Sequence, residues 1–194
     1  HLDYLDLGGG LGITYNQEIP PHPAKYGQEI IKTLKTFYSK PITLIFEPGR
    51  VIVGNAGVLV FKTLYLKRGQ KKFIIVDAAM NDTIRPALYQ SYHQILHIDE
   101  SIEKHGPREN ADVVGPICES GDFLAKDRDL PLFQPNELGV LRSAGAYGFS
   151  MSSNYNSRPR IPEVLVNGKE FFCIRKRETY EDLIRGESIP SFLN

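Results

Sequence analysis

Short apolar runs and one amphipathic stretch alternate along the first fifty residues. Residues 2–7 predict a strand that runs directly into the glycine sequence at positions 8–10, and residues 42–46 are apolar on both faces, as in a parallel strand covered on both sides. Between these two strands, apolar side chains recur at helical spacing, at Ile30, Ile31, Leu34, Phe37 and Tyr38. The pattern predicts a strand–helix–strand unit.

The pattern changes near residue 55, where β-rich segments separated by turn residues begin. Strands are predicted at residues 57–66, 72–77, 112–118 and 139–143, and Asn167-Gly168 is typical of a tight hairpin turn. Thr179 followed by Asp182 indicates the start of a short helix that ends near Ile184. We therefore expect an α/β unit in residues 1–54 and a mostly antiparallel β domain with a short terminal helix in residues 55–194.

The charge balance narrows the class of protein. The chain has 23 basic and 23 acidic residues and no block of like charges, which argues against a nucleic-acid-binding or membrane-surface protein. Its longest apolar runs are far shorter than the roughly 20 residues of a membrane span. Two cysteines are too few for a disulfide framework, so a cytoplasmic protein is expected. Because the sequence starts without Met or a signal-peptide pattern, we also expect a fragment.

The most informative polar positions follow the two predicted parallel strands. The glycines at positions 8–10 end the first strand, and Glu47-Pro48-Gly49-Arg50 ends the second. In α/β proteins such strand ends share one rim where ligands bind, and glycines allow backbone N–H groups to approach a phosphate closely. Each of these two motifs by itself is also consistent with a tight turn, and the second is also consistent with a turn that carries an exposed salt bridge.

Three further stretches could carry chemistry. Arg85 and Tyr89 are four residues apart, so in a helix they would share a face and could hold a carboxylate; the alternative is an ordinary exposed arginine. Cys118 and Glu119 follow a predicted strand, although a lone cysteine is more often a small buried hydrophobe than a reactive group. The glycine- and aromatic-rich residues 145–156 suit the close approach of a planar ring or form a corner of the β domain.

No metal site is predicted from the sequence. The two cysteines lie far apart, and no histidine cluster at ligand spacing accompanies either of them. His93 and His97 are four residues apart, which favours two positions on a helix surface over a pair of metal ligands.

Five motifs follow one another along the chain: LDLGGGLG at residues 5–12, EPGR at 47–50, NDTIRPALY at 81–89, CESGD at 118–122 and GAYGFSMSSNYNSRPRIPEVLV at 145–166. Together they resemble the diaminopimelate decarboxylases, over essentially the whole chain. The resemblance implies the C-terminal part of a (β/α)8 barrel followed by a Greek-key-like β domain, an α/β plus all-β fold similar to alanine racemase and the eukaryotic ornithine decarboxylases. The cofactor that it implies is pyridoxal 5′-phosphate.

The resemblance also implies roles for individual residues. Cys118 is the acid that would protonate the substrate carbon after carbon dioxide leaves. The cofactor would be held by Gly8, Gly9, Gly10, Glu47, Pro48, Gly49, Arg50 and Tyr147, with Glu47 near the pyridine nitrogen. The substrate would contact Arg50, Arg85, Tyr89, Glu119 and Tyr147, where the arginines and Tyr89 bind its distal carboxylate and Glu119 its distal ammonium group.

The reaction implied is the decarboxylation of meso-2,6-diaminopimelate to L-lysine, the last step of lysine biosynthesis. The family's Cys and Tyr elements reach into the active site of a neighbouring subunit, which implies a homodimer with shared sites. No lysine of this chain lies in the family's cofactor-lysine motif, so the fragment alone is expected to be inactive. Two alternatives stay open: a decarboxylase of the same fold acting on ornithine, arginine or carboxynorspermidine, and a non-catalytic binding homologue.

Overall fold

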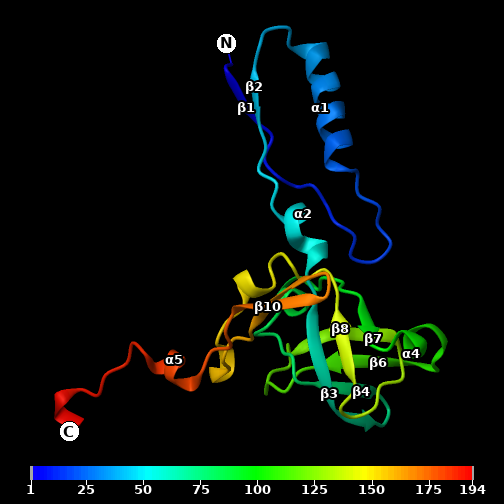
Figure 1. The fold of residues 1–194 in the computed structure, drawn as a ribbon, viewed down its shortest axis with the longest axis vertical. Helices are drawn as coiled ribbons and strands as arrows, with labels where there is room; N and C mark the ends of the chain where they lie inside the picture. Colours follow the sequence, from blue (N-terminus) through cyan, green and yellow to red (C-terminus); the bar gives the residue numbers. More distant parts are fainter. Residues whose placement is uncertain (1, 194) are drawn as a thin grey trace.

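Residues 2–193 are described by a computed structural model, in which two parts follow one another along the long axis (Figure 1). The first part is a parallel pair of strands, β1 (Tyr4–Asp6) and β2 (Thr43–Ile45), joined by the crossover helix α1 (Pro23–Phe37). This arrangement confirms the predicted strand–helix–strand unit. A short helix, α2 (Arg50–Val53), leads from β2 into the second part, which is built around a β-sheet.

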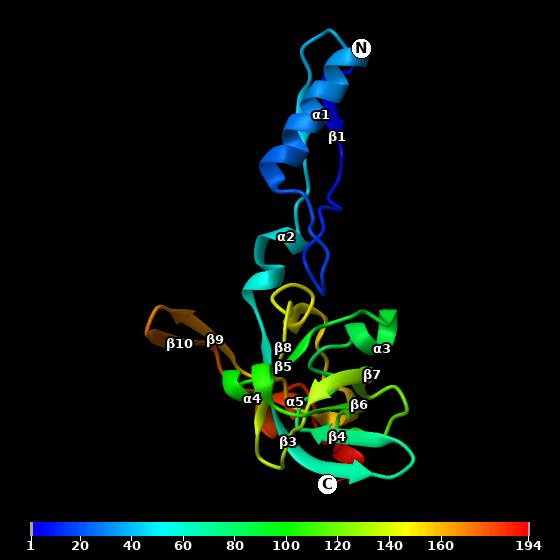
Figure 2. The ribbon, with the colours of Figure 1, turned by 90° about the vertical axis from the view of Figure 1, so that its right-hand side faces the viewer.

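Helix α1 begins several residues before the predicted apolar stretch because two residues fix its start. His22 accepts the backbone N–H of Ala24 through Nδ1 at 3.2 Å, and Pro23 brings a preset φ to the first helical position. None of the residues of α1 is buried within the described chain, and Phe37 is 84% exposed. Figure 2 shows this unit projecting away from the six-stranded sheet. Tyr26 packs its ring against Phe46, and Ile30 and Leu34 are half-buried, whereas Ile31 and Phe37 stay exposed.

The second part is a six-stranded mixed sheet in the order β5-β8-β3-β4-β6-β7. Its strands are β3 (Leu59–Arg68), β4 (Lys72–Val76), β5 (Ile95–His97), β6 (Arg108–Val114), β7 (Phe123–Pro131) and β8 (Leu138–Leu141). Neighbouring strands are antiparallel except β4 and β6, where Phe73 pairs with Asp112 in a parallel register. The edge strands β5 and β7 contact each other, so the sheet is nearly closed.

The parallel pair arises from a long crossover. Between β4 and β6 the chain forms α3 (Arg85–Tyr89), β5 and α4 (Glu100–His105) before it returns to the sheet. A parallel neighbour needs such a crossover, whereas a tight turn joins only antiparallel strands. The prediction of a mostly antiparallel domain is therefore correct apart from this pair. The crossover also brings α3 against β7.

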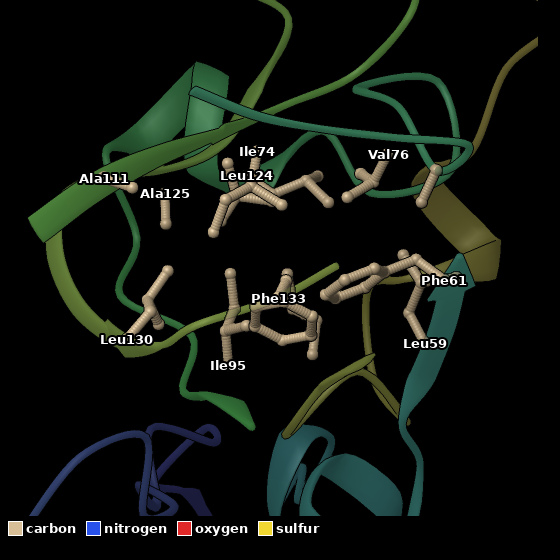
Figure 3. Close-up of a cluster of buried hydrophobic side chains, with 13 residues drawn as sticks. Leu59, Phe61, Ile74, Val76, Ile95, Ala111, Leu124, Ala125, Leu130 and Phe133 are labelled. Atoms are coloured by element: carbon tan, nitrogen blue, oxygen red, sulfur yellow. The ribbon is translucent and has the colours of Figure 1, made fainter. Parts of the chain in front are cut away.

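The core lies between the opposite walls of this curved sheet. Figure 3 shows two facing rows of buried side chains: Ile74, Val76, Ala111, Leu124 and Ala125 in one, and Leu59, Phe61, Ile95, Leu130 and Phe133 in the other. The rings of Phe61 and Phe133 lie 6.1 Å apart, and a β-carbon on Gly139 would collide with the ring of Phe61. This packing fixes the strand ends from which the loops of the candidate site emerge.

Two sequence predictions about this part are wrong. The strand predicted at residues 112–118 ends at Val114, because Gly115 donates its N–H to the carbonyl of Asp122 at 3.1 Å and starts a turn that contains Cys118. His93 and His97 do not lie on a helix surface. His97 ends β5 opposite Gly139, His93 lies in the loop before it, and both side chains are buried.

A hairpin and a short helix follow the sheet, as predicted. Strands β9 (Glu163–Asn167) and β10 (Glu170–Arg175) are antiparallel, and Gly168 takes a φ of +61° in the turn between them. Helix α5 (Tyr180–Ile184) begins with a capping box formed by Thr179 and Asp182. Within residues 2–193, no helix combines the length and the apolar character that crossing a membrane requires.

Candidate active site

The two loops at the ends of β1 and β2 lie side by side, as the shared rim predicts. Leu7 donates its N–H to the carbonyl of Ile45 at 3.1 Å, and Glu47 donates its N–H to the carbonyl of Gly8 at 2.9 Å. A β-carbon on Gly9 would stand 2.6 Å from the carbonyl oxygen of Glu47, so only glycine allows this approach. The predicted cofactor residues from both loops therefore form one continuous surface.

Gly8 and Gly10 give the loop its shape. Their φ angles are +66° and +84°, in the left-handed region that glycine adopts at little cost. A β-carbon at either position would meet nothing within 4 Å. The space beside the loop is thus open to a small ligand, and the backbone conformation is the reason for glycine at these two positions.

A hollow of about 400 Å³ lies where α2, α3 and the loop after β8 meet. Its lining consists of Arg50, Arg85, Tyr89, Tyr147 and Met151. Four of these five residues are predicted site residues, and they come from three separate parts of the sequence: Arg50, the pair Arg85 and Tyr89, and Tyr147. The fold brings them together around one opening.

Close backbone packing places Tyr147 beside α2. Gly145 donates its N–H to the carbonyl of Gly54 at 3.1 Å, and Ala144 donates its N–H to the carbonyl of Gly57 at 2.9 Å. Tyr147 itself has a φ of +60°, which a bulky residue adopts only where its surroundings enforce it. This conformation carries the side chain over Arg50, whose guanidinium carbon lies 5.5 Å from the ring centroid of Tyr147.

The hollow is positively charged. The guanidinium carbon of Arg85 lies 5.6 Å from the ring of Tyr89 and 5.7 Å from that of Tyr147. Neither Arg50 nor Arg85 forms an ion pair with a carboxylate of the described chain. Two cations without an acidic partner, next to tyrosine hydroxyl groups, suit the binding of a carboxylate or another planar anion.

Arg85 is not an ordinary exposed arginine. It begins α3, is 7% exposed, and donates from Nη2 to the hydroxyl oxygen of Ser91 at 3.2 Å. Tyr89 lies one helical turn later on the same face, as their spacing predicts, and is largely exposed. Arg85 is therefore a charge buried at the base of the hollow, and Tyr89 flanks its opening.

Sequence reasoning missed Tyr15. Its hydroxyl oxygen accepts a hydrogen bond from Nη1 of Arg50 at 2.9 Å, and its ring meets the imidazole of His93 edge-on. The sequence gives only a weak indication of Tyr15, because a single tyrosine in a loop after a glycine turn is not part of a helical or strand pattern. His93 is buried beside it, and burial lowers the pKa of its imidazole, with the charges of Arg85, Arg128 and Arg50 acting in the same direction.

Cys118 and Glu119 lie in a separate place, in the turn between β6 and β7. The buried carboxylate of Asp122 holds this turn by accepting the N–H of Ile117 at 2.6 Å and that of Met80 at 2.7 Å. Burial raises the pKa of Asp122, against the lowering effect of these two hydrogen bonds. Cys118 is exposed, so the interpretation of a buried packing cysteine is wrong.

Tyr155 is the partner of Glu119. Its hydroxyl donates to Oε2 of Glu119 at 3.1 Å, and this hydrogen bond raises the pKa of the tyrosine. A second hollow, of about 250 Å³, lies beside this pair and is lined by Met80, Asn81, Ile84, Ser153 and Tyr155. The fold thus separates the predicted site residues into an arginine–tyrosine group and a Cys118–Glu119 group.

No three His, Cys, Asp or Glu side chains gather in residues 2–193 as a metal site would require. Tyr147 lies over Arg50 of its own chain and lines this hollow.

Three comparisons with known proteins point to the same family. Residues 13–145 match the family of pyridoxal-dependent decarboxylases, C-terminal sheet domain. The diaminopimelate decarboxylase of Vibrio cholerae is 49% identical over 190 residues, and that of Pseudomonas aeruginosa is 53% identical over 193 residues; each alignment covers 97% of this chain. The crystal structure of the Helicobacter pylori diaminopimelate decarboxylase complexed with L-lysine superposes with a TM-score of 0.84 and 42% identity, over 95% of this chain.

The chain spans 44% of the length of each of these relatives. Identity near one half over almost all of the chain, together with the same fold, is decisive for the family. The chain therefore belongs to the pyridoxal-dependent decarboxylases, in the family that contains the diaminopimelate decarboxylases.

Proposed function

We propose that this chain is the C-terminal part of an enzyme that decarboxylates meso-2,6-diaminopimelate to L-lysine with pyridoxal 5′-phosphate. The observation that carries the proposal is the hollow in which Arg50 and Arg85 have no acidic partner among residues 2–193. A substrate with a second amino-acid end brings the carboxylate that such a pair lacks. The names of the relatives at 49% and 53% identity support the same reaction.

Residues 1–54 would supply the last strands of a (β/α)8 barrel, and residues 55–194 the C-terminal β domain. The parallel pairing of β1 and β2 across α1 is the repeating unit of such a barrel. The apolar side chains of α1 that stay exposed, Ile31 and Phe37, are expected where the rest of the barrel packs. The Schiff-base lysine then lies in a part of the enzyme outside these residues.

The residues present fit pyridoxal 5′-phosphate. Gly9 approaches the backbone of Glu47 more closely than any β-carbon allows, and the space beside Gly8 and Gly10 is open, as a phosphate cradle requires. Gly8, Gly9, Gly10 and the loop Glu47-Pro48-Gly49-Arg50 would hold the cofactor, with Tyr147 over it. When bound, the cofactor supplies an electron sink for the pair released as carbon dioxide leaves.

The chain's own residues would orient the substrate and manage its protons. Arg50, Arg85 and Tyr89 bind the distal carboxylate, and this contact fixes the reacting carbon in one orientation. Glu47 holds the proton on the pyridine nitrogen. Because Arg85 is buried, its charge–carboxylate contact is stronger than a similar contact in water.

Cys118 and Glu119 would complete the active site of a neighbouring subunit in a homodimer. Support comes from their exposure and from their separation from the arginine–tyrosine group of their own chain. Cys118 would donate the proton to the substrate carbon, and Glu119 would bind the distal ammonium group. Two exposed free thiols and a balanced charge are consistent with a cytoplasmic location.

The test is a side-by-side assay of an enzyme that contains residues 1–194 together with the family's lysine region. We expect efficient release of carbon dioxide from meso-diaminopimelate, with L-lysine as the product, and much slower turnover of lysine, ornithine, arginine and carboxynorspermidine. A preference for ornithine, arginine or carboxynorspermidine would overturn the substrate assignment. Cofactor binding without turnover of any of them would favour a non-catalytic homologue.

A further inference from the structure

Tyr15 contacts both arginines of the hollow but does not line the hollow itself. Its ring centroid lies 5.6 Å from the guanidinium carbon of Arg50 and 5.7 Å from that of Arg85. The hydrogen bond from Arg50 to its hydroxyl oxygen adds a directional contact. Tyr147 also touches both guanidinium groups, but it forms part of the lining. Tyr15 is therefore a partner that both arginines share outside the lining of the hollow.

The loop that carries Tyr15 is fixed from several sides. The carbonyl oxygen of Thr14 accepts hydrogen bonds from Nδ2 of Asn55 at 2.7 Å and from Oγ of Ser143 at 2.9 Å. The carboxylate of Glu18 accepts the backbone N–H of Tyr15 at 3.0 Å. Asn55 follows α2 and Ser143 follows β8, so the loop is tied to the same elements that deliver Arg50 and Tyr147.

His93 packs edge-on against the ring of Tyr15. The two ring centroids are 5.1 Å apart and the ring planes meet at 80°. Nδ1 of His93 lies 2.8 Å from the carbonyl oxygen of Arg142, and because a carbonyl only accepts, Nδ1 carries the proton. The buried imidazole, with its lowered pKa, is neutral at pH 7. Tyr15 thus packs against a fixed, uncharged neighbour.

The arginines need such a partner. Two guanidinium groups without a carboxylate between them repel each other, so the groups that they contact decide their orientation. An aromatic face attracts a cation, and a phenol oxygen accepts its N–H. The buried Nε of Arg85 has no hydrogen-bond partner in residues 2–193, which leaves the aromatic rings and Ser91 to hold this side chain.

We infer that Tyr15 is a positioning residue for substrate recognition: it holds Arg50 and Arg85 side by side, so that both face the distal carboxylate of the substrate. The inference rests on the proposed function for the identity of that substrate. It adds a residue that acts through the arginines and not through its own contact with substrate or cofactor.

Two variants separate the contributions of Tyr15. Tyr15→Phe removes the hydrogen bond to Arg50 and keeps the ring, so we expect KM for meso-diaminopimelate to rise about threefold to tenfold. Tyr15→Leu removes the ring as well, and KM should rise by about thirtyfold or more, since two cation–ring contacts are lost. In both variants kcat should change much less than KM. A large loss of kcat at unchanged KM would contradict a positioning role.

Tyr65 offers a matched control. It is 68% exposed on β3 and contacts none of the residues of the hollow, so Tyr65→Phe and Tyr65→Leu should leave KM unchanged. Thermal unfolding of each variant shows whether it is folded. If Tyr15→Leu does not fold, the test depends on Tyr15→Phe alone. A KM of Tyr15→Phe equal to that of the parent then overturns the inference.

A binding measurement keeps this test separate from the reaction. Pimelate has the carbon chain and both carboxylates of the substrate but no amino group, so it cannot react. Calorimetric titration of the same enzyme should show weaker pimelate binding in the order parent, Tyr15→Phe, Tyr15→Leu. Equal affinities overturn the role of Tyr15. A parent enzyme that binds pimelate but does not decarboxylate diaminopimelate overturns the proposed function. The role of Tyr15 is then tested by the pimelate titration alone.

Discussion

The backbones of Gly57 and Gly145 are in such close contact that a β-carbon on Gly57 would stand 2.5 Å from the α-carbon of Gly145. The first glycine lies between α2 and β3, and the second lies in the loop that follows β8. This contact joins the start of the β domain to the loop that carries Tyr147. The geometry of the hollow therefore depends on two residues that have no side chain.

The first prediction follows from this contact. In Gly145→Ala the new methyl group would collide with the carbonyl of Val53 and the N–H of Gly57, so the loop must move. We expect the free energy of unfolding to fall by about 2 kcal/mol or more, as for other overpacked sites, and substrate affinity to fall with it. Urea denaturation measures the first effect.

Gly186→Ala is the matched control, because a β-carbon there meets nothing within 4 Å. This variant should keep the stability of the parent to within about 0.5 kcal/mol. Equal stability of Gly145→Ala and Gly186→Ala would mean that the contact between the two glycines is looser than described.

Local patterns in the sequence were sufficient to predict some of the helices, strands and turns. The strand–helix–strand unit, the hairpin turn at Gly168 and the capping box at Thr179 each depend on residues close together in the chain. Strand β7 was missed because its middle is the charged run from Lys126 to Asp129, which a strand accepts only because Leu124 and Leu130 anchor its ends in the core. Strand β5 and helix α4 are too short for a clear periodicity.

The candidate site shows the same limit. Its two strand-end loops could be predicted to share a rim, because parallel strands end at the same edge. The role of Tyr15 could not be predicted, since it depends on contacts with Arg50 and Arg85, 35 and 70 positions later in the sequence. The separation of Cys118 from the arginines depends on the turn that Asp122 closes, which no local pattern reveals.

The second prediction concerns pH. Burial lowers the pKa of His93 below its usual value of 6.5, so below that pH the unfolded chain binds a proton that the folded chain does not. The contribution of His93 to stability is therefore fully present above pH 6.5 and is lost as the pH falls, by at most about 1.4 kcal/mol per pH unit. Urea denaturation at pH 7.5 and pH 5.5 measures the difference.

In His93→Gln this part of the pH dependence should disappear, even if the variant is less stable at both pH values. His105→Gln removes an exposed histidine at the end of α4 and controls for the loss of one histidine. A difference between the two pH values that is the same in the parent and in His93→Gln would show that His93 binds a proton in the folded protein.

The third prediction concerns proton donation. In an enzyme that contains this chain and the lysine region, Cys118→Ala should slow turnover of diaminopimelate by about 10²–10⁴-fold, the usual contribution of a general acid. Cofactor affinity, measured by spectroscopic titration, should stay the same, because Cys118 lies apart from the glycine loop. Cys173→Ala is the control, since Cys173 is the other exposed thiol and lies on β10. Turnover that is equal in both variants would assign the acid to another residue.

The last prediction concerns discrimination between substrates. Removing Arg85 leaves the distal carboxylate of diaminopimelate with one arginine fewer in a buried place, and loss of one side of such a pair costs about 2–5 kcal/mol. We expect this loss in kcat/KM for diaminopimelate, because the distal contact also sets the position of the reacting carbon. Lysine has no distal carboxylate, so it should be a poor substrate for the parent and should lose much less in Arg85→Ala.

Two further variants sharpen this comparison. Arg85→Lys keeps the charge but not the planar two-point contact, so its kcat/KM should fall between those of the parent and Arg85→Ala. Arg108→Ala removes an arginine that pairs with Asp129 at the sheet edge, away from the hollow, and should leave the ratio of the two substrates unchanged. If Arg85→Ala lowers kcat/KM equally for diaminopimelate and lysine, Arg85 supports the fold of the hollow and does not read the distal carboxylate.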